Sequence, residues 1–299
     1  MYKVRVPATS ANMGPGFDCM GIALDIYNTV EVHEIPEGLI IENHGRDADL
    51  ITKDGTNLIY RAMERVFRQT GFVPTGLKII SYNDIPVARG LGSSAASTAA
   101  GLLLANALIG EKLDMKRIIE LGTALEGHPD NIVPALIGGM TLSYAQDTST
   151  VGYIKLDFPE KLRMLVMVPD FLLSTAMARK VLPRQVELGN AVFNVSRAAL
   201  MVAALTAGEL DHLKYAVQDK LHQPYREKLI PGMQEVFQQA YNAGARGVFL
   251  SGAGSTLIAL VDADNNDFLS RLKGFLDSMS CKWELKYADI SRQGAARIQ

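Results

Sequence analysis

Residues 86–100 read PVARGLGSSAASTAA, a glycine-rich loop that runs into a helix of small apolar residues. Gly90 and Gly92 leave the backbone free to adopt positive φ and to approach a ligand closely, while Ser93 and Ser94 stand where the helix begins. The first turn of a helix exposes about four unpaired N–H groups at the positive end of the helix dipole. The stretch therefore predicts a cradle for an anion, and phosphate is its natural ligand.

The same loop also partly resembles two other nucleotide-binding motifs and a simple helix cap. A Walker A loop needs a lysine directly after its last glycine, and this loop contains none. A dinucleotide-binding fingerprint is nearly matched by Gly90-x-Gly92-x-x-Ala95, but the acidic residue expected about 20 residues later falls in residues 111–114, which read as a connection between helices. From this stretch alone, a glycine-serine cap on a buried helix is an equally good interpretation.

Composition is that of an ordinary globular protein. The 299 residues, 48% hydrophobic and 21% charged, are enough for two domains and a large core. A net charge of −2 provides no global field that would favour nucleic acid, so no nucleic-acid partner is expected. Two cysteines without zinc-ligand spacing, no apolar signal segment and no apolar run of about 18 residues predict a cytoplasmic protein with no membrane partner.

Hydrophobic periodicity and turn residues divide the chain into two α+β halves. In the first half, strands are expected at 2–7, 21–32, 77–81, 139–144 and 153–156, and helices at 57–71, after Ser94, at 114–127 and after 127–131. In the second half, strands are expected at 162–168, 246–250, 257–261 and 281–288, separated by helices or short loops, which favours an antiparallel sheet. A change in composition near residue 158 gives predicted domains of 1–157 and 158–299.

Glu120 lies among apolar residues of the helix expected at 114–127. A carboxylate near a core face is costly unless it is paired or binds a metal, although it can also lie at the rim of the helix. The hydroxyl of Ser94, the carboxylate of Glu120 and phosphate oxygens would suit Mg²⁺. Asp130 reads either as a helix cap or as a functional group, and His128 either as a satisfied loop histidine or as part of a site.

Two further loops combine glycines with small or polar residues. Residues 8–18 contain Asn12 and Asp18, which either belong to a turn-rich connection or face a ligand. Residues 251–255 read SGAGS, which is too long for a two-residue hairpin turn and allows a close approach to a phosphate or to another backbone segment.

The three glycine-bearing loops at 7–18, 86–96 and 251–255 together resemble the motif set of the GHMP small-molecule kinases. Within that superfamily, the first loop, His128-Pro129-Asp130-Asn131 and residues 175–183 are similar to the homoserine kinase family. The resemblance covers essentially the whole chain. It implies a two-domain α+β fold, with an N-terminal ribosomal-protein-like domain that contains a left-handed β-α-β crossover and a ferredoxin-like C-terminal domain. Crossovers of this hand are rare, so residue patterns alone would not predict one.

The resemblance also implies an activity, MgATP-dependent phosphorylation of the side-chain hydroxyl of L-homoserine on the way to threonine. It places Asn57 at the base of ATP, and Ser94 and Glu120 on Mg²⁺. The residues expected around the phosphates are Pro86, Val87, Ala88, Arg89, Gly90, Leu91, Gly92, Ser93, Ser94, Ala95 and Ala96.

For the substrate, the resemblance implies that Asn12 and Asp18 face homoserine, with Asp18 as the counter-charge of its ammonium group. Arg179 and Arg226 match the arginines that bind the carboxylate, which a planar guanidinium can do with paired hydrogen bonds. Without the resemblance both would read as surface arginines. Asn131 would lie near the reacting hydroxyl, with Thr175 and His128 close by.

Asn131 stands where some related kinases have an aspartate that accepts the hydroxyl proton. Because an asparagine amide cannot be that base, we expect direct in-line attack that depends on positioning and charge neutralisation. The alternatives are another small-alcohol kinase of the superfamily, such as one acting on mevalonate, and a catalytically silent nucleotide-binding regulator. The family often forms homodimers, but the sequence does not reveal the oligomeric state.

Overall fold

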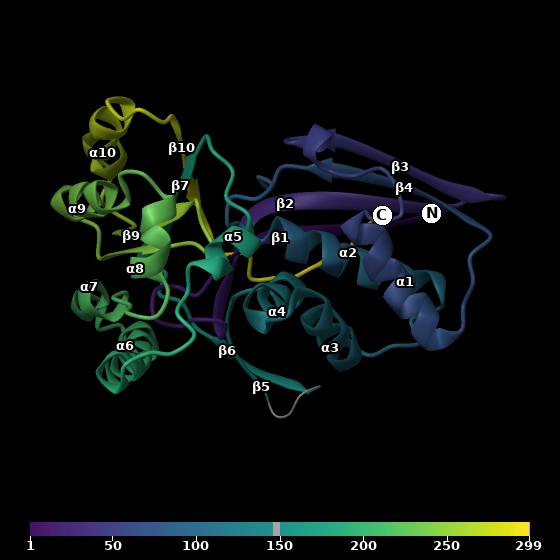
Figure 1. Cartoon of the computed structure of the whole chain (residues 1–299), viewed down its shortest axis with the longest axis horizontal. Coiled ribbons are helices and arrows are strands. Elements are labelled where there is room, and N and C mark those ends of the chain that lie inside the picture. Colours follow the sequence, from purple (N-terminus) through teal and green to yellow (C-terminus); the bar gives the residue numbers. More distant parts are fainter. Residues whose placement is uncertain (146–149, 299) are drawn as a thin grey trace.

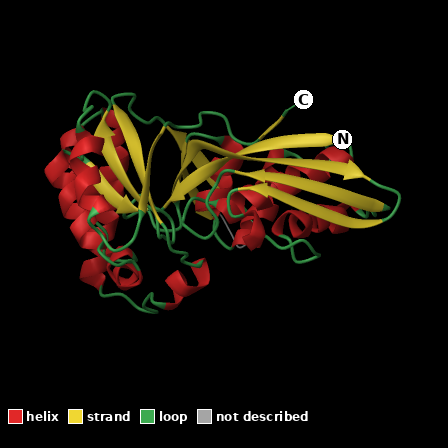
Figure 2. Ribbon diagram, turned by 90° about the horizontal axis from the view of Figure 1, so that it is seen from above, coloured by secondary structure: helices red, strands yellow, loops and turns green. Residues whose placement is uncertain are grey.

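The computed structural model describes residues 1–145 and 150–298 and contains two sheets, each packed against helices (Figures 1 and 2). The first sheet consists of β1 (Tyr2–Ala11), β2 (Met20–Glu34), β3 (Gly38–Gly45), β4 (Gly76–Asn83), β5 (Met140–Ala145), β6 (Val151–Leu156) and β11 (Ala296–Arg297). The second sheet consists of β7 (Leu162–Pro169), β8 (Gly247–Leu250), β9 (Leu257–Asp262) and β10 (Trp283–Ala288).

The helices follow the same division. The first half contains α1 (Leu58–Thr70), α2 (Ser93–Leu108), α3 (Met115–Glu126) and α4 (Pro129–Ile137). The second half contains α5 (Thr175–Lys180), α6 (Leu188–Ala207), α7 (Leu213–Ala216), α8 (Gln223–Arg226), α9 (Met233–Ala243) and α10 (Phe268–Asp277). Most predicted elements are therefore present, with boundaries that differ by a few residues.

The first sheet is built around the long strand β2. Its strand order is β11-β1-β2-β4-β3, and the N-terminal part of β2 also pairs with β5, which in turn pairs with β6. The parallel neighbours β3 and β4 are joined through α1 and form a β-α-β unit. The register of β1 against β2 shifts between Pro7 and Ala8, where the strand turns toward the loop that contains Asp18.

Helix α2 is the central helix of the first half, and small residues allow it to pack closely on both sides. It contacts α1, α3, α4 and β1. A Cβ added at Gly101 would lie 2.3 Å from the carbonyl oxygen of Ile59, so only glycine permits this approach of α1 and α2. The burial of α2 fixes the position of its N-terminus, where the glycine-rich loop ends.

The second half has a ferredoxin-like arrangement, which confirms the prediction of an α+β fold. Its antiparallel strands lie in the order β10-β7-β9-β8, and the chain runs β7, helices, β8, β9, α10, β10. Helices α9 and α10 pack against the sheet around Val236, Phe268 and Leu272, which are fully buried.

The last residues of the chain lie outside the second sheet, although the predicted second domain extends to residue 299. Strand β11 pairs with β1 at Val4 and Arg297, and Ile290 forms a bridge to Leu24. The N- and C-terminal ends consequently lie near each other beside the first sheet (Figure 1). A two-residue strand has no measurable periodicity, so the sequence pattern could not indicate this return.

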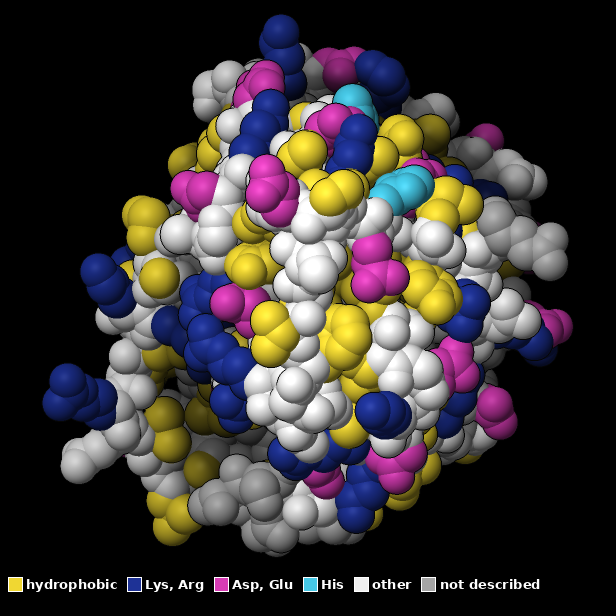
Figure 3. Space-filling view, turned by 90° about the vertical axis from the view of Figure 1, so that its right-hand side faces the viewer, with side chains coloured by type: hydrophobic (Ala, Val, Ile, Leu, Met, Phe, Trp, Pro, Cys, Tyr) yellow, Lys and Arg dark blue, Asp and Glu magenta, His cyan; other side chains and the backbone are white. Residues whose placement is uncertain are grey.

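One helix in the described part of the chain, α6, is long and apolar enough by composition to span a membrane, with a mean hydropathy of 1.4. Length and composition alone are weak evidence, because helices of proteins without a span pass the same test. Its Asn194 is buried and donates to Asp219 at 2.8 Å and to the carbonyl oxygen of Pro15 at 3.3 Å, which ties α6 to both halves of the fold. Basic and acidic side chains are interspersed on the face shown in Figure 3.

Candidate active site

A cavity of about 300 Å³ opens at the N-terminus of α2 and is lined by both halves of the protein. The first half contributes Asn12, Asp18, Leu58, Arg61, Ala62, Pro86, Ala88, Gly90, Gly92, Ser93, Ser94, Ala95, Thr98, Leu125, Glu126, His128, Asp130 and Asn131. The second half contributes Leu173, Thr175, Arg179, Arg226, Gly252 and Ala253. All seven residues predicted to bind the substrate therefore line one cavity, next to the predicted phosphate loop.

The glycine-rich loop has the backbone geometry expected of a cradle. Gly90 and Gly92 have φ of 80° and 70°, and Ala88 also has a positive φ of 53°. A Cβ at Gly92 would lie 1.9 Å from Oγ1 of Thr9, so no larger residue fits between the loop and β1. The first turn of α2 lines the cavity at Ser93 and Ser94, and the first N–H groups of a helix have no partner within it.

Four residues of the predicted phosphate loop do not line the cavity: Val87, Arg89, Leu91 and Ala96. Two of these anchor the loop instead. Arg89 donates through Nη1 to Oδ2 of Asp47 at 2.7 Å, and the N–H of Val87 donates to the same oxygen at 3.0 Å. Leu91 and Ala96 are buried in the core.

The third glycine-bearing loop, 251–255, approaches another backbone segment, which was one of its two expected roles. Ser251 donates through Oγ to the carbonyl oxygen of Gly90 at 2.6 Å. The N–H of Thr256 donates to the carbonyl oxygen of Arg89 at 3.0 Å. From the segment before α5, the N–H of Leu173 donates to the carbonyl oxygen of Ala88 at 2.9 Å. The second half of the protein therefore holds the phosphate loop in place.

The carboxylate beside Ser94 is Glu126 rather than the predicted Glu120. Ser94 Oγ donates to Oε1 of Glu126 at 3.0 Å, and Thr98 Oγ1 donates to the same oxygen at 2.6 Å. Glu120 instead accepts from Nη1 of Arg117 at 2.9 Å and does not line the cavity. Six residues along a helix correspond to a rotation of about 240°, so the two glutamates point in different directions from α3.

One feature of the sequence indicates a role for Glu126, although the pattern of apolar residues does not show it. Glu126 is the last residue of α3, directly before the cap Gly127, where an acidic side chain opposes the helix dipole. An unfavourable charge at that position indicates a function. Its apolar neighbours made Glu120 the predicted metal ligand, but the ion pair with Arg117 compensates the charge of its carboxylate.

Asn57 caps a helix and does not face the predicted nucleotide site. Its Oδ1 accepts from the N–H groups of Ile59 at 2.9 Å and Tyr60 at 3.4 Å, while its Nδ2 donates to the carbonyl oxygen of Thr52 at 2.7 Å. Both lone pairs of Oδ1 and one N–H of Nδ2 are used inside the protein, and Asn57 does not line the cavity. Its neighbour Leu58 lines the cavity instead.

Asp18 and Arg179 form an ion pair in the cavity. Arg179 Nη2 lies 2.7 Å from Oδ1 of Asp18, and Nη1 lies 3.3 Å from Oδ2. Asn12 holds the backbone of Asp18: its Oδ1 accepts from the N–H of Asp18 at 3.0 Å, and its Nδ2 donates to the carbonyl oxygen of Gly252 at 2.9 Å. Asn12 therefore positions Asp18 while lining the cavity itself.

Arg226 is not a surface arginine, since only 2% of it is exposed. Its Nε donates to the carbonyl oxygen of Ala178 at 3.3 Å and its Nη1 to that of Gly252 at 2.8 Å. Burial foremost, and then the charge of Arg179, lower the pKa of Arg226 to about 10. The guanidinium remains protonated at neutral pH, so the cavity contains two cations close to the carboxylate of Asp18.

The start of α4 presents His128, Asp130 and Asn131 to the same cavity. His128 Nδ1 is hydrogen-bonded to Oδ1 of Asp130, and Asn131 Oδ1 accepts from Thr9 Oγ1 at 2.7 Å. Burial opposes protonation of His128, but the hydrogen bond and the charge of Asp130 outweigh it and raise the pKa of the histidine. Asp130 thus has a place in the site, where the sequence left a helix cap as an equal alternative.

The chain is similar to known kinases along its whole length. The GHMP kinases N terminal domain model matches residues 57–139, and the GHMP kinases C terminal model matches residues 201–277. The homoserine kinase of Caldicellulosiruptor bescii is 47% identical over 297 residues, which cover 99% of this chain and 96% of the relative.

Solved structures of kinases are also similar to this chain. A crystal structure of homoserine kinase from Cytophaga hutchinsonii superposes with a TM-score of 0.88 and 29% identity, covering 99% of this chain and 97% of that one. An L. major mevalonate kinase shares the fold, with a TM-score of 0.73 and 17% identity, and coverage of 98% and 97%. Because close sequence identity extends over nearly the whole chain, this protein belongs to the homoserine kinase family of the GHMP kinases.

Proposed function

We propose that this protein transfers the terminal phosphoryl group of ATP to the side-chain hydroxyl of L-homoserine, giving O-phospho-L-homoserine, a step toward threonine. The observation that carries the proposal is the charge pattern of one cavity. Two guanidinium groups and a carboxylate lie beside a loop shaped for phosphate, which matches a zwitterionic amino acid next to a nucleotide.

The nucleotide end of the cavity is the N-terminus of α2. Its free N–H groups and helix dipole favour the phosphates, and the positive φ of Gly90 and Gly92 lets the backbone approach them. The hydroxyl of Ser94 and the carboxylate of Glu126, 3.0 Å apart, are hard oxygen donors that fit Mg²⁺. When bound there, the ion would neutralise charge on the phosphate oxygens.

The amino-acid end of the cavity is formed by Asp18, Arg179 and Arg226. The carboxylate of Asp18 is the counter-charge for an ammonium group, and the guanidinium groups suit a carboxylate with paired hydrogen bonds. In the free protein Asp18 and Arg179 satisfy each other. A bound zwitterion would present the opposite charge to each of them.

The transfer needs no dedicated base in this arrangement. The Asn131 amide cannot take the hydroxyl proton, and its oxygen already accepts from Thr9. His128 is engaged through Nδ1 with Asp130, whose hydrogen bond and charge raise the pKa of the histidine against the effect of burial. We therefore infer direct in-line attack of the hydroxyl, with positioning and charge neutralisation providing the acceleration.

Asn131→Asp tests this account of the missing base. The variant places a second carboxylate next to the buried Asp130, whose Oδ1 now lies 3.4 Å from Nδ2 of Asn131. Repulsion between the two carboxylates should lower kcat about tenfold or more at neutral pH. A severalfold increase in kcat would instead show that the wild-type enzyme lacks a base from which it would benefit.

The substrate assignment is tested by measuring ADP release with ATP and either homoserine or mevalonate. Mevalonate has a carboxylate but no ammonium group, so we expect turnover with homoserine only. Asp18→Asn should raise the KM for homoserine at least tenfold, because the ammonium group loses its counter-charge. Turnover of mevalonate in preference would favour another small-alcohol kinase, and no ADP release with any alcohol would favour a silent regulator.

The family resemblance also leads us to propose a cytoplasmic homodimer.

A further inference from the structure

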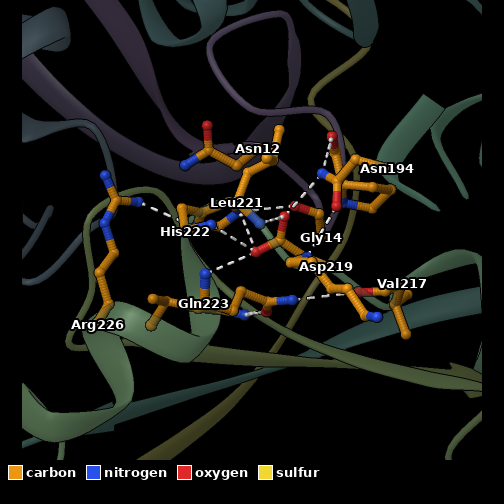
Figure 4. A network of polar contacts seen from close by, with 12 residues as sticks. Asn12, Gly14, Asn194, Val217, Asp219, Leu221, His222, Gln223 and Arg226 are labelled. Atoms are coloured by element: carbon orange, nitrogen blue, oxygen red, sulfur yellow. Dashed lines mark hydrogen bonds and ion pairs between the residues drawn. The ribbon is translucent and has the colours of Figure 1, made fainter. Parts of the chain in front are cut away.

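Arg226 is one end of a buried network of polar side chains to which the proposed reaction assigns no role (Figure 4). His222 is fully buried, and Asp219, Gln223 and Asn194 are each less than 9% exposed. Burying this many polar groups is costly unless each is hydrogen-bonded, so the network calls for an explanation. The network lies directly behind Arg226, the arginine proposed to bind the substrate carboxylate.

The two hydrogen bonds of the His222 ring fix its tautomer. Nε2 lies 2.7 Å from the carbonyl oxygen of Gly14, and Nδ1 lies 3.2 Å from Nη1 of Arg226. A carbonyl oxygen only accepts and a guanidinium only donates, so Nε2 carries the hydrogen and Nδ1 offers its lone pair. Burial lowers the pKa of His222 despite the nearby carboxylate of Asp219, which keeps the ring neutral at neutral pH.

The ring is held in this orientation from several sides. Asp219 Oδ2 accepts from the N–H groups of His222 at 2.9 Å and Gln223 at 2.6 Å, and its Oδ1 accepts from Asn194 Nδ2 at 2.8 Å. Phe17 stacks on the ring with 5.2 Å between centroids and 23° between planes. His222 therefore cannot turn away from Arg226 without disturbing both α6 and the loop that carries Asp18.

We propose that His222 is a positioning residue for substrate recognition, whose Nδ1 lone pair orients the Arg226 guanidinium toward the substrate carboxylate. The inference rests on the proposed function. His222, Gly252 and Ala178 accept from Nη1 and Nε, while Nη2 has no hydrogen-bond partner within residues 1–145 and 150–298. The two N–H groups of Nη2 are thus left for a ligand.

The same ring also sets the distance between the two ends of the amino-acid site. Its Nε2–H binds Gly14, four residues before Asp18, and its Nδ1 binds Arg226. The counter-charge for the ammonium group and the cation for the carboxylate are therefore tied to one rigid side chain. Loss of the contact to Arg226 should affect homoserine far more than ATP.

Two amide variants separate the contacts of His222. In His222→Asn the amide takes the place of Nδ1, so its oxygen can accept from Arg226. In His222→Gln the longer amide reaches the place of Nε2, where it can donate to Gly14 but leaves Arg226 without its acceptor. We expect His222→Gln to raise the KM for homoserine about tenfold with less than a twofold change for ATP, and His222→Asn to stay within about threefold of wild type.

Equal effects of the two variants on homoserine, or equal effects on both substrates, would overturn the proposal. A double-mutant cycle tests whether His222 acts through Arg226: in an Arg226→Lys background, His222→Gln should add less than a twofold rise in KM. Effects that multiply independently would also overturn it. If wild type releases no ADP with homoserine, the proposed function fails; if only the variants disagree, only the inference fails.

A measurement on the wild-type protein covers the case in which a variant does not fold. Nuclear magnetic resonance of protein labelled with ¹⁵N-histidine distinguishes the ring tautomers, and the chain has only five histidines. We expect the His222 ring to be neutral and protonated at Nε2 at pH 7, with an Nδ1 signal that shifts when homoserine is added. A His222 ring protonated at Nδ1, or at both nitrogens, would contradict the proposal.

Discussion

Glu126→Gln is expected to lower kcat/KM by about 10²–10³-fold and to raise the Mg²⁺ concentration needed for half-maximal activity. The variant keeps the shape of the side chain but removes the negative charge beside Ser94, whose Oγ lies 3.0 Å from Oε1. Loss of one preorganised charge at a phosphoryl-transfer site typically has an effect of this size. Steady-state rates measured across a magnesium titration check both expectations.

Glu120→Gln is the matched control on the same helix. Glu120 pairs with Arg117 at 2.9 Å outside the cavity, and such a pair near the surface contributes about 0–1 kcal/mol. We expect less than a twofold change in kcat/KM and no change in the magnesium requirement. A larger effect at Glu120 than at Glu126 would restore the interpretation based on sequence periodicity and refute the one based on the structure.

Arg179→Lys and Arg226→Lys should each raise the KM for homoserine by about 10- to 100-fold, equivalent to ~1.5–3 kcal/mol of lost charged hydrogen bonds. Lysine keeps the charge but lacks the planar fork that binds two oxygens at once. Arg179 already uses that fork, with Asp18 at 2.7 and 3.3 Å. The KM for ATP should change less than twofold, which separate titrations of the two substrates check.

Arg184 provides a control from the segment that follows α5. It is exposed and does not line the cavity. Arg184→Lys should leave both KM values unchanged. Parallel increases for homoserine and ATP in the Arg179 or Arg226 variants would argue against carboxylate binding and indicate a general loss of structure.

Much of the site was predictable because local sequence determines local backbone conformation. Glycines at 90 and 92 are needed for positive φ, and the serines after them begin a helix, so the backbone shape of the loop follows from the order of residues alone. The two-domain fold and the substrate residues came from the resemblance of three loops rather than from periodicity. The whole set of substrate residues, Asn12 to Arg226, lines one cavity.

The partners of individual side chains were decided by tertiary structure. Whether Glu120 or Glu126 approaches Ser94 depends on the rotation of α3 against α2, which the apolar positions define only to within a broad face. The resemblance places Asn57 at the base of ATP, whereas in the structure its Oδ1 caps α1 and its Nδ2 donates to the carbonyl oxygen of Thr52.

Sequence by itself therefore determined most elements, the backbone shape of the glycine-rich loop and, through the family resemblance, the residues expected to bind the substrate. Only the tertiary structure decided that β11 returns to β1, that Arg226 is buried against His222, and that Asp18 faces Arg179 across 161 positions of the chain. The physical reason is that backbone conformation depends on neighbouring residues, whereas a hydrogen bond or ion pair depends on which distant side chains packing brings within about 3 Å.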